Sequence, residues 1–314
     1  MPPIVLLGPQ RPHPNLADAL AHHEVQGPVV AITAGWRHDE AELDGLTESI
    51  GEVTHLPLYR WFDDVAEHAP EVAALYRERQ TRVQRFKELY RLRIRSALTT
   101  VRDLVDRLPS DPELVAPQLE RATEVVRQID REVLGSVDEV RQAYRGLEHR
   151  FDVPWIRDRR DEAAQRISEA GAILLAGGHV AVLRNRLLFF GVEHALADAT
   201  APVFAWGAGA MVLTERIVLY YDDAPEGPTD PEVLDHGLGL LPGQVLLPHA
   251  SERLRLNDIS RVSALSRRFA PATCLGLENG AWVESTAGGW CNRGPAGSAS
   301  WLTAQGTLDA MEAP

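Results

Sequence analysis

The sequence predicts an α/β protein with a mainly parallel sheet flanked by helices. A long helical insertion interrupts this α/β domain. Over residues 1–66 and 166–314, short apolar runs alternate with amphipathic segments. This is the pattern of buried parallel strands joined by helices. Residues 67–165 instead carry helical periodicity almost throughout. We therefore expect one α/β domain built from the two outer segments, with the middle segment inserted into it.

The expected strands are apolar runs that mostly end at glycine or proline. Helical spacing over Asn15–His23 and Asp39–Ile50 separates the first three. An acidic loop, Asp222–Asp230, follows a later strand. Because both outer segments have this character, we expect their strands to share one sheet. The runs are Ile4–Leu7, Val29–Thr33, Val53–Leu58, Ala172–Ala176, Pro202–Trp206, Ile217–Tyr221, Val245–Leu247, Thr273–Leu277 and Trp282–Glu284.

The insertion predicts two long helices. Apolar residues recur at intervals of three and four from Pro70 to Leu108, as in an amphipathic helix. Ser110–Glu113 breaks this run and supplies a cap and a first-turn proline for a second helix, which continues to Leu147. We expect an antiparallel hairpin or small bundle. A structural or oligomerisation role, through a homodimer or a protein partner, is the first interpretation, and a lid is the alternative.

Composition excludes several classes of protein. The chain has 314 residues, of which 45% are hydrophobic and 25% charged, so it is a globular protein. Its 45 acidic and 32 basic residues give a net charge of −13, which disfavours nucleic acid as a partner. The two cysteines form no CxxC pair, so neither a zinc cluster nor a disulfide framework is expected. Residues Met1–Gly8 lack the basic and apolar stretches of a signal peptide and no apolar run reaches membrane length, so we expect a cytoplasmic protein without membrane contact or cofactor.

The most informative stretch is Val203–Val212, in which an apolar strand runs into a turn of small residues and then a helix. This is the arrangement of a nucleophile elbow, in which a sharp turn presents one side chain at the tip of a strand. The small residues are needed because strand and helix backbones pack closely there. The sequence therefore predicts a functional site at Gly207.

The chain resembles the peptidase family of cyanophycinase and dipeptidase E, within the class I glutamine amidotransferase-like fold. That family's elbow commonly reads Gly-Thr-Ser-Ala-Gly-Ala, with the serine as nucleophile. Four further stretches resemble the family in the same order, and they cover the third segment well, the opening strands loosely and the insertion not at all. They are Gly177-Gly178-His179 after a strand, Gly237–Gly243, the histidine position His249 with its following arginines, and Leu275–Ala281 with Glu278.

The departure from the family lies at the nucleophile. Aligned on Ala208-Gly209-Ala210, the serine position holds Gly207. Glycine cannot form an acyl-enzyme, so the first step of serine-type catalysis is closed. The resemblance implies that His249 and Glu278 remain as a residual catalytic pair, without a metal.

A ligand-binding pocket is what the remaining residues predict. The backbone N–H of Ala208, with that of Gly178 or His179, would form the oxyanion hole of an active relative. Here they would bind a small acidic or peptide-like ligand beside Gly177 and Gly207. Arg37 follows the second strand at its carboxyl end, where open α/β sheets bind ligands. It either faces a ligand carboxylate or pairs within its own loop.

Three readings of function stay open at this point. The first is a non-hydrolytic relative that binds a small acidic or peptide-like ligand or serves as an assembly subunit. The second is a hydrolase, a peptidase or amidase, that uses a water activated by His249 and Glu278, or a metal held by these two and His179. The third is a shifted alignment, in which another serine or cysteine acts. Thr214 lies about two turns into the following helix, too far to substitute, Cys274 is expected to be buried, and a reactive thiol at Cys291 is possible.

Overall fold

A seven-stranded sheet forms the centre of the molecule in a computed structural model that describes residues 2–12, 14–145, 153–222, 229–286 and 289–312. Its strand order is β11-β10-β1-β5-β4-β2-β3. Strands β1, β5, β4, β2 and β3 run parallel, and β10 and β11 add an antiparallel edge. The strands are β1 (Ile4–Leu7), β2 (Val29–Ile32), β3 (Thr54–His55), β4 (Ala172–Leu175), β5 (Val203–Trp206), β10 (Trp282–Thr286) and β11 (Gly289–Asn292).

Helices cover both faces of this sheet, which is why β1, β4 and β5 are buried along their whole length. Side chains alternate between the faces: Val5 and Leu7 pack with α1 and α2, and Ile4 and Leu6 belong to the core on the opposite face. The predicted α/β class is confirmed. The flanking elements are α1 (Leu16–His22), η1 (Ala34–Asp39), α2 (Asp44–Ile50), α3 (Leu58–His68), α6 (Pro154–Ser168), α7 (Val180–Phe189) and α8 (Val192–Asp198).

The expectation that all strands of the two outer segments share one sheet is right only in part. Strands β1, β2 and β3 of the first segment share the central sheet with β4, β5, β10 and β11 of the last, but the remaining strands of the last segment lie outside it. A second sheet has the order β13-β12-β9-β8, and β6 pairs with β7 as a separate ribbon. The apolar runs of all these strands look alike in sequence. Which sheet a strand joins depends on its pairing partners, and the sequence does not reveal them. The elements are β6 (Arg216–Leu219), β7 (Glu232–His236), β8 (Gln244–Pro248), α10 (Ala250–Arg253), α11 (Ile259–Phe269), β9 (Thr273–Leu277), β12 (Ala299–Leu302) and β13 (Leu308–Ala310).

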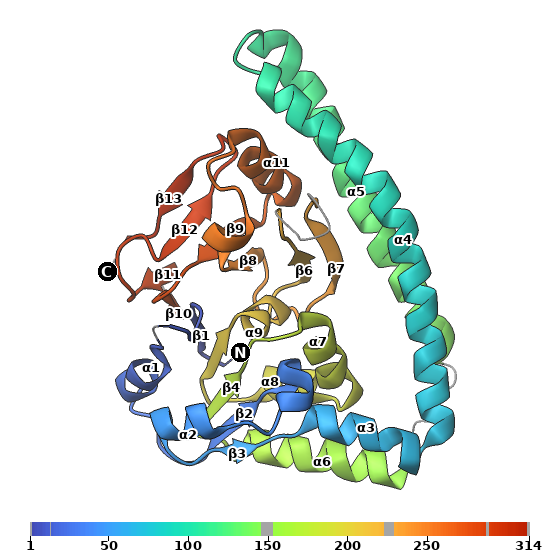
Figure 1. Ribbon diagram of the computed structural model, residues 1–314, viewed down its shortest axis with the longest axis vertical. Coiled ribbons are helices and arrows are strands. Elements are labelled where there is room, and N and C mark those ends of the chain that lie inside the picture. Colours follow the sequence, from blue (N-terminus) through green and yellow to red (C-terminus); the bar gives the residue numbers. More distant parts are fainter. Residues whose placement is uncertain (1, 13, 146–152, 223–228, 287–288, 313–314) are drawn as a thin grey trace.

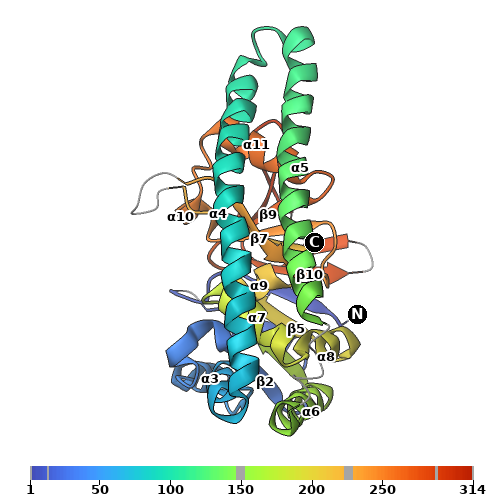
Figure 2. The same cartoon turned by 90° about the vertical axis from the view of Figure 1, so that its right-hand side faces the viewer.

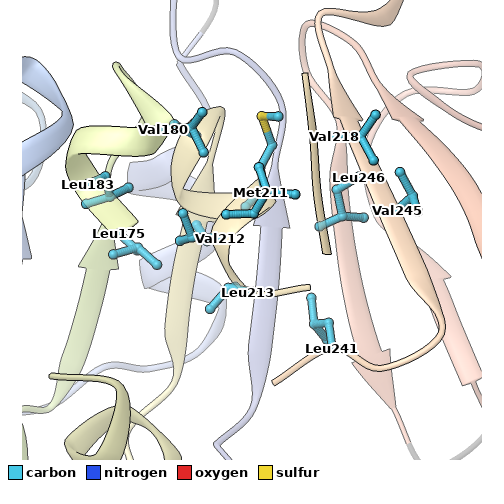
Figure 3. Close-up of a cluster of buried hydrophobic side chains, with 14 of the residues drawn as sticks. Leu175, Val180, Leu183, Met211, Val212, Leu213, Val218, Leu241, Val245 and Leu246 are labelled. Atoms are coloured by element: carbon cyan, nitrogen blue, oxygen red, sulfur yellow. The ribbon is translucent and has the colours of Figure 1, made fainter. Parts of the chain in front are cut away.

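The short helix α9 (Ala208–Val212) joins these parts. Figure 3 shows Met211 and Val212 of this helix between Leu183 of α7 and Val245 of β8. All four side chains are buried in the main hydrophobic core. The turn that begins α9 is therefore held from both the central sheet and the second sheet.

The inserted hairpin consists of α4 (Pro70–Arg107) and α5 (Pro112–Arg145), close to the predicted helices. It runs along one side of the molecule, and its tip extends beyond the rest (Figures 1 and 2). At 38 residues, α4 is about 57 Å long at about 1.5 Å per residue. Helices α3 and α6, on either side of the hairpin in sequence, lie below the central sheet in Figure 1.

A buried ion pair ties the hairpin to the α/β part. Arg268 of α11 donates to both carboxylate oxygens of Asp130 in α5, at 2.7 Å each. The Tyr90 hydroxyl of α4 donates to Asp130 at 2.9 Å and accepts from the backbone N–H of Val233 in β7 at 2.9 Å. Four elements thus meet at one satisfied polar cluster, which fixes the hairpin against β7 and α11.

Two sequence predictions extend beyond the described residues. The expected end of the second helix at Leu147 lies outside them, as does the interior of the predicted loop Asp222–Asp230. Within the described part of the chain, no helix has the length and apolarity needed to cross a membrane.

Candidate functional site

The turn after β5 opens into a pocket of about 460 Å³ at the carboxyl edge of the central sheet. Parallel strands of α/β proteins commonly place their ligand sites at this edge. The structure brings together three predicted regions here, Gly178, Gly207-Ala208 and His249. The remaining lining residues are Val180, Met211, Leu219, Tyr220, Tyr221, Thr229, Asp230, Glu232, Pro248 and Arg253.

Gly207 stands at the tip of β5 in a conformation that side chains rarely adopt. Its φ is 55° and its ψ is −126°. A Cβ atom added here would lie 3.2 Å from the Cα of Gly177, so a side chain needs a small displacement of that neighbour. A sharp, strained strand-to-helix turn is what a nucleophile elbow requires. The backbone therefore has the predicted elbow shape, with hydrogen in place of a side chain.

The helix after the elbow packs closely on β4, as its small residues predict. A Cβ atom at Gly209 would lie 1.9 Å from the carbonyl oxygen of Leu175, so only glycine fits. Gly177 is buried against the same turn, near the carbonyl oxygen of Trp206 and the amide nitrogen of Ala208. Gly177 thus supports the pocket wall without being among its lining residues.

The sequence analysis left the N–H of Gly178 or that of His179 as the second backbone donor to a ligand, and the N–H of His179 is already hydrogen-bonded within the protein. The N–H of His179 donates to the carbonyl oxygen of Gly35 at 2.7 Å. The His179 ring caps α7 by accepting from the N–H of Val182 at 3.3 Å. Gly178, in contrast, lines the pocket with φ at 102°. The N–H of Ala208 belongs to the first turn of α9 and has no partner within its helix.

His249 lies at the pocket with a carboxylate beside it, but that carboxylate is Glu252. Nδ1 of His249 is 3.2 Å from a carboxylate oxygen of Glu252. Glu278, the predicted partner, instead accepts from the N–H and the hydroxyl of Ser251 at 2.7 and 2.6 Å. His249 and Glu278 are therefore brought to the same short helix, α10, without being hydrogen-bonded to each other.

Two acidic residues on the pocket wall were missed by the sequence analysis. Asp230 pairs with Arg102, and Glu232 pairs with Arg91 at 2.8 Å. Both arginines come from α4, so no local pattern near Asp230 or Glu232 indicates the pairing. Arg253 lines the same pocket, and none of the described carboxylates pairs with it. Arg253 is one of the arginines that follow His249 in the family resemblance.

Arg37 lines a different hollow, of about 610 Å³, which also includes Glu40 and His55. Its side chain is exposed, and its backbone is strained, with φ at 64° and ψ at −120°. Glu40 is buried there and accepts from the N–H groups of Tyr59 and Arg60 at 2.7 and 3.0 Å. Burial raises the pKa of Glu40 from 4.5 to about 7 against the lowering effect of these bonds. Arg37 does not share the pocket of Gly207.

The alternative nucleophiles are poorly placed for catalysis. Thr214 is buried and donates to the carbonyl oxygen of Met211 at 2.8 Å. Cys274 is buried in β9, and burial raises the pKa of its thiol to about 12. Cys291 lies in β11 at the far edge of the central sheet, opposite Glu284, and does not line the pocket. A shifted nucleophile among these three is not supported.

Three residues that line the pocket carry a hydroxyl group; those of Tyr220 and Thr229 are engaged elsewhere, and Tyr221 is exposed. Tyr220 is buried and donates to the carbonyl oxygen of Pro248 at 2.5 Å, and burial raises its pKa. Thr229 donates to the carbonyl oxygen of Tyr221. In the described part of the chain, no cluster of three histidine, cysteine or acidic residues could hold a metal ion. The metal site that would combine His179 with His249 and Glu278 does not form in this structure.

An α/β protein with its pocket at a strand–turn–helix elbow belongs to the broad class of peptidase-like α/β folds. Comparison with protein families matches residues 131–289, just over half of the chain, to peptidase family S51. The chain belongs to this family, which confirms the family resemblance found in the sequence. The matched span contains every lining residue of the Gly207 pocket.

Among solved structures, the chain is similar to a peptidase from an acI-B1 Actinobacterium, with a TM-score of 0.45 and 12% sequence identity. That alignment covers 100% of this chain and 95% of the other. No curated protein matches the chain.

Proposed function

We propose that this member of peptidase family S51 binds a small acidic, peptide-like ligand in the Gly207 pocket and does not hydrolyse it through a covalent intermediate. The observation that carries the proposal is Gly207 itself. It occupies the elbow with φ at 55° and has no side chain to attack a carbonyl carbon. The engaged hydroxyls of Tyr220 and Thr229 supply no replacement.

The charge balance of the pocket supports an acidic ligand. Both lining carboxylates, Asp230 and Glu232, are paired with arginines of α4. Arg253 has no such partner among the described residues and is available to a ligand carboxylate. A guanidinium can bind a carboxylate through two parallel hydrogen bonds. A ligand with a free carboxylate therefore gains a charge pair in this pocket, and a cationic ligand does not.

The test compares three dipeptides, Asp-Ala, Ala-Ala and Lys-Ala, each amidated at the C-terminus so that only the first side chain changes the charge, by isothermal titration calorimetry. We expect Asp-Ala to bind most tightly and Lys-Ala least. Arg253→Gln should weaken Asp-Ala binding at least about tenfold, in line with the loss of a hydrogen-bonded charge pair. Arg107→Gln, at the tip of the hairpin, is the matched control and should leave binding unchanged. Equal binding of all three dipeptides would contradict an acidic ligand.

A serine-directed fluorophosphonate tests the catalytic half of the proposal. The wild-type protein should stay unlabelled, because Gly207 offers no oxygen. Labelling of any residue of the pocket would overturn the non-covalent reading.

The His249–Glu252 pair favours one second candidate, a hydrolase that activates water. An imidazole oriented by a carboxylate is the usual form of a general base. In that case wild-type protein would release free amino acids from Asp-Ala, and His249→Gln would abolish the release. Absence of turnover by the wild type leaves the binding function as the remaining candidate.

A further inference from the structure

Lys87 is the only lysine in the sequence. Of the 32 lysine and arginine residues, 31 are arginines. An arginine stays protonated throughout the pH range in which proteins are folded, whereas a lysine loses its proton readily when it is buried. A lysine at this single position therefore supplies a property that arginine lacks, which is a neutral form.

The side chain of Lys87 occupies a core position of α4. Lys87 is 7% exposed and lies in one stripe with Val83, Tyr90 and Ile94, which are all buried. Intervals of three and four residues separate these positions, so the helix pattern calls for an apolar residue at position 87. Burial of an ammonium group at such a place costs free energy unless a carboxylate compensates the charge.

The carboxylate that acts on Lys87 is that of Asp235 in β7, and both of its oxygens are already engaged. One oxygen accepts from Arg141 of α5 at 2.5 Å. The other is 3.2 Å from a guanidinium nitrogen of Arg184 in α7 and accepts from the backbone N–H of His236 at 2.8 Å. Within the described part of the chain, no residue forms an ion pair or a hydrogen bond with the ammonium group of Lys87.

Positive charge is in excess around this amine. The side chains of Arg184, Arg141 and Asp235 are 4%, 19% and 8% exposed, so two shielded cations share one shielded carboxylate. Asp138 also pairs with Arg141, but it is 55% exposed, and solvent weakens its effect. A protonated Lys87 adds a third cation to this group.

The protonation of Lys87 responds to these surroundings. Burial lowers the pKa of its ammonium group from 10.5 to about 8; the charge of Asp235 opposes this shift, and the charges of Arg184, Arg141 and Arg91 add to it. At pH 8 about half of the Lys87 side chains are therefore neutral amines, against fewer than about one in a hundred for a lysine in water. The neutral amine is a nucleophile, and the ammonium form is not.

We propose that the amine of Lys87 reacts with carbon dioxide and is held as a carbamate by the arginines around it. The nitrogen lone pair forms a bond to the carbon of carbon dioxide, and the electrons of one C–O π bond become the negative charge of the carbamate. The nitrogen releases one proton to solvent, and nothing is oxidised or reduced. Two negative groups, the carbamate and Asp235, then balance the two positive groups of Arg141 and Arg184.

Size and charge favour carbon dioxide over larger electrophiles. Lys87 lines neither the Gly207 pocket nor the hollow of Arg37, so a carbonyl compound bound in either does not meet this amine. Carbon dioxide is small and uncharged, and it can reach a side chain with little exposure. Acylation would give a neutral amide, which leaves the excess of positive charge in place. Only the carbamate removes this excess.

Trapping followed by digestion tests the proposal, because the full chain has a single lysine. Native protein is equilibrated with ¹³C-bicarbonate at pH 8 and treated with triethyloxonium, which converts a carbamate into a stable ethyl ester. A lysine-specific protease then cuts the denatured chain after Lys87 unless this lysine is blocked. We expect most of the trapped wild type to stay at the full length of 34.7 kDa, with the ¹³C label on Lys87 by mass spectrometry. Protein kept free of bicarbonate should be cut.

The matched control moves the lysine to the surface of the same helix. The double variant Lys87→Met and Arg85→Lys puts a flexible apolar side chain into the core and a lysine at an exposed position two residues earlier. Because an exposed lysine is almost wholly protonated at pH 8, it should be trapped at least about tenfold less than Lys87. Wild type that is unfolded in urea before bicarbonate is added should also be cut. Complete cutting of the trapped native wild type, or equal protection of the relocated lysine, would overturn the proposal.

Arg141→Gln tests whether the arginines hold the carbamate. This variant loses one of the two balancing cations, and the pKa of Lys87 rises, so the protected fraction should fall severalfold. Bicarbonate should also raise the urea midpoint of the wild type, because a group added only to the native state stabilises it by mass action. The relocated-lysine variant should show no such rise. Full protection of Lys87 in Arg141→Gln would overturn the assignment of the arginines, and an equal rise in both proteins would overturn the link to Lys87.

Discussion

Arg102 of α4 forms an ion pair with Asp230 at the pocket, across a sequence separation of 128 residues. The hairpin is therefore part of the pocket's charge balance and not only an appendage on its side. Arg91, three turns earlier on α4, holds Glu232 in the same way at 2.8 Å. Both contacts place a positive charge next to a carboxylate that would otherwise face the ligand.

The first prediction follows from these two pairs. The double variant Arg91→Gln and Arg102→Gln removes both cations and leaves two negative charges on the pocket wall. Asp-Ala should then bind at least about tenfold more weakly, and Lys-Ala should bind more tightly than to the wild type. Calorimetry of both dipeptides measures the change. If the wild type prefers Asp-Ala and the double variant keeps the same preference, the paired carboxylates do not act on the ligand.

The second prediction concerns the missing nucleophile. Gly207→Ser places a hydroxyl at the elbow, near His249. Because φ at this position is 55°, the side chain costs about 1–3 kcal/mol of stability. We expect the variant to be labelled by a fluorophosphonate and the wild type not.

The matched control for this variant is Gly207→Ala, which introduces the same backbone strain without an oxygen. It should lose similar stability and stay unlabelled. Adding His249→Gln to Gly207→Ser should reduce labelling strongly, because the hydroxyl then has no base. Labelling that survives this addition would show that His249 does not activate the position.

The third prediction concerns pH and Glu40. In the folded chain the pKa of Glu40 is about 7, against 4.5 when unburied. Between these values the folded state binds more protons than the unfolded state, so stability from this group is fully present below pH 4.5 and is lost as the pH rises through 7. The full shift corresponds to about 3 kcal/mol.

Glu40→Gln stays neutral and should escape this loss. Its free energy of unfolding, relative to wild type, should therefore rise by about 2–3 kcal/mol between pH 5 and pH 8.5. Urea unfolding at the two pH values provides the measurement. The loss of one acceptor for the N–H groups of Tyr59 and Arg60 lowers the variant's stability at both pH values alike. A relative stability that does not change with pH would contradict the prediction.

The fourth prediction concerns the ion pair that anchors the hairpin. Arg268→Met leaves Asp130 buried without a cation, which should cost about 3–5 kcal/mol. The double variant Arg268→Met and Asp130→Leu removes both charges and should recover most of this loss. Denaturant unfolding of the three proteins measures the difference. If the single and double variants lose the same free energy of unfolding, the loss comes from the changed packing around Arg268 and not from the uncompensated carboxylate of Asp130.

The fold was largely predictable because its signals are local. The strands β1, β2, β4 and β5 are short apolar runs, and α4 and α5 have unbroken helical periodicity, so length and spacing identify them. The division into two sheets and a ribbon was not predictable. Which strand pairs with which depends on long-range packing, for example β8 beside β9 instead of the central sheet.

The site was predictable where backbone shape requires a particular residue. Gly209 excludes any Cβ atom, and Gly207 has a positive φ, so the small-residue turn identifies the elbow. The partners of the charged residues were not predictable. Glu278 is near His249 in space but bonds to Ser251, because its side chain reaches the first turn of α10. Such pairings depend on which nearby donor a carboxylate reaches first, and this cannot be predicted from the order of residues in the sequence.

The hydrogen bond from the N–H of His179 to the carbonyl oxygen of Gly35 connects the two hollows of the sheet edge. Gly178, on the wall of one hollow, immediately precedes His179, and Arg37, on the rim of the other, follows Gly35 by two residues. Any ligand that displaces the backbone at Gly178 must either break this bond or pull the neighbouring loop with it. A change of shape at one opening therefore either costs this hydrogen bond or is passed on to the other opening.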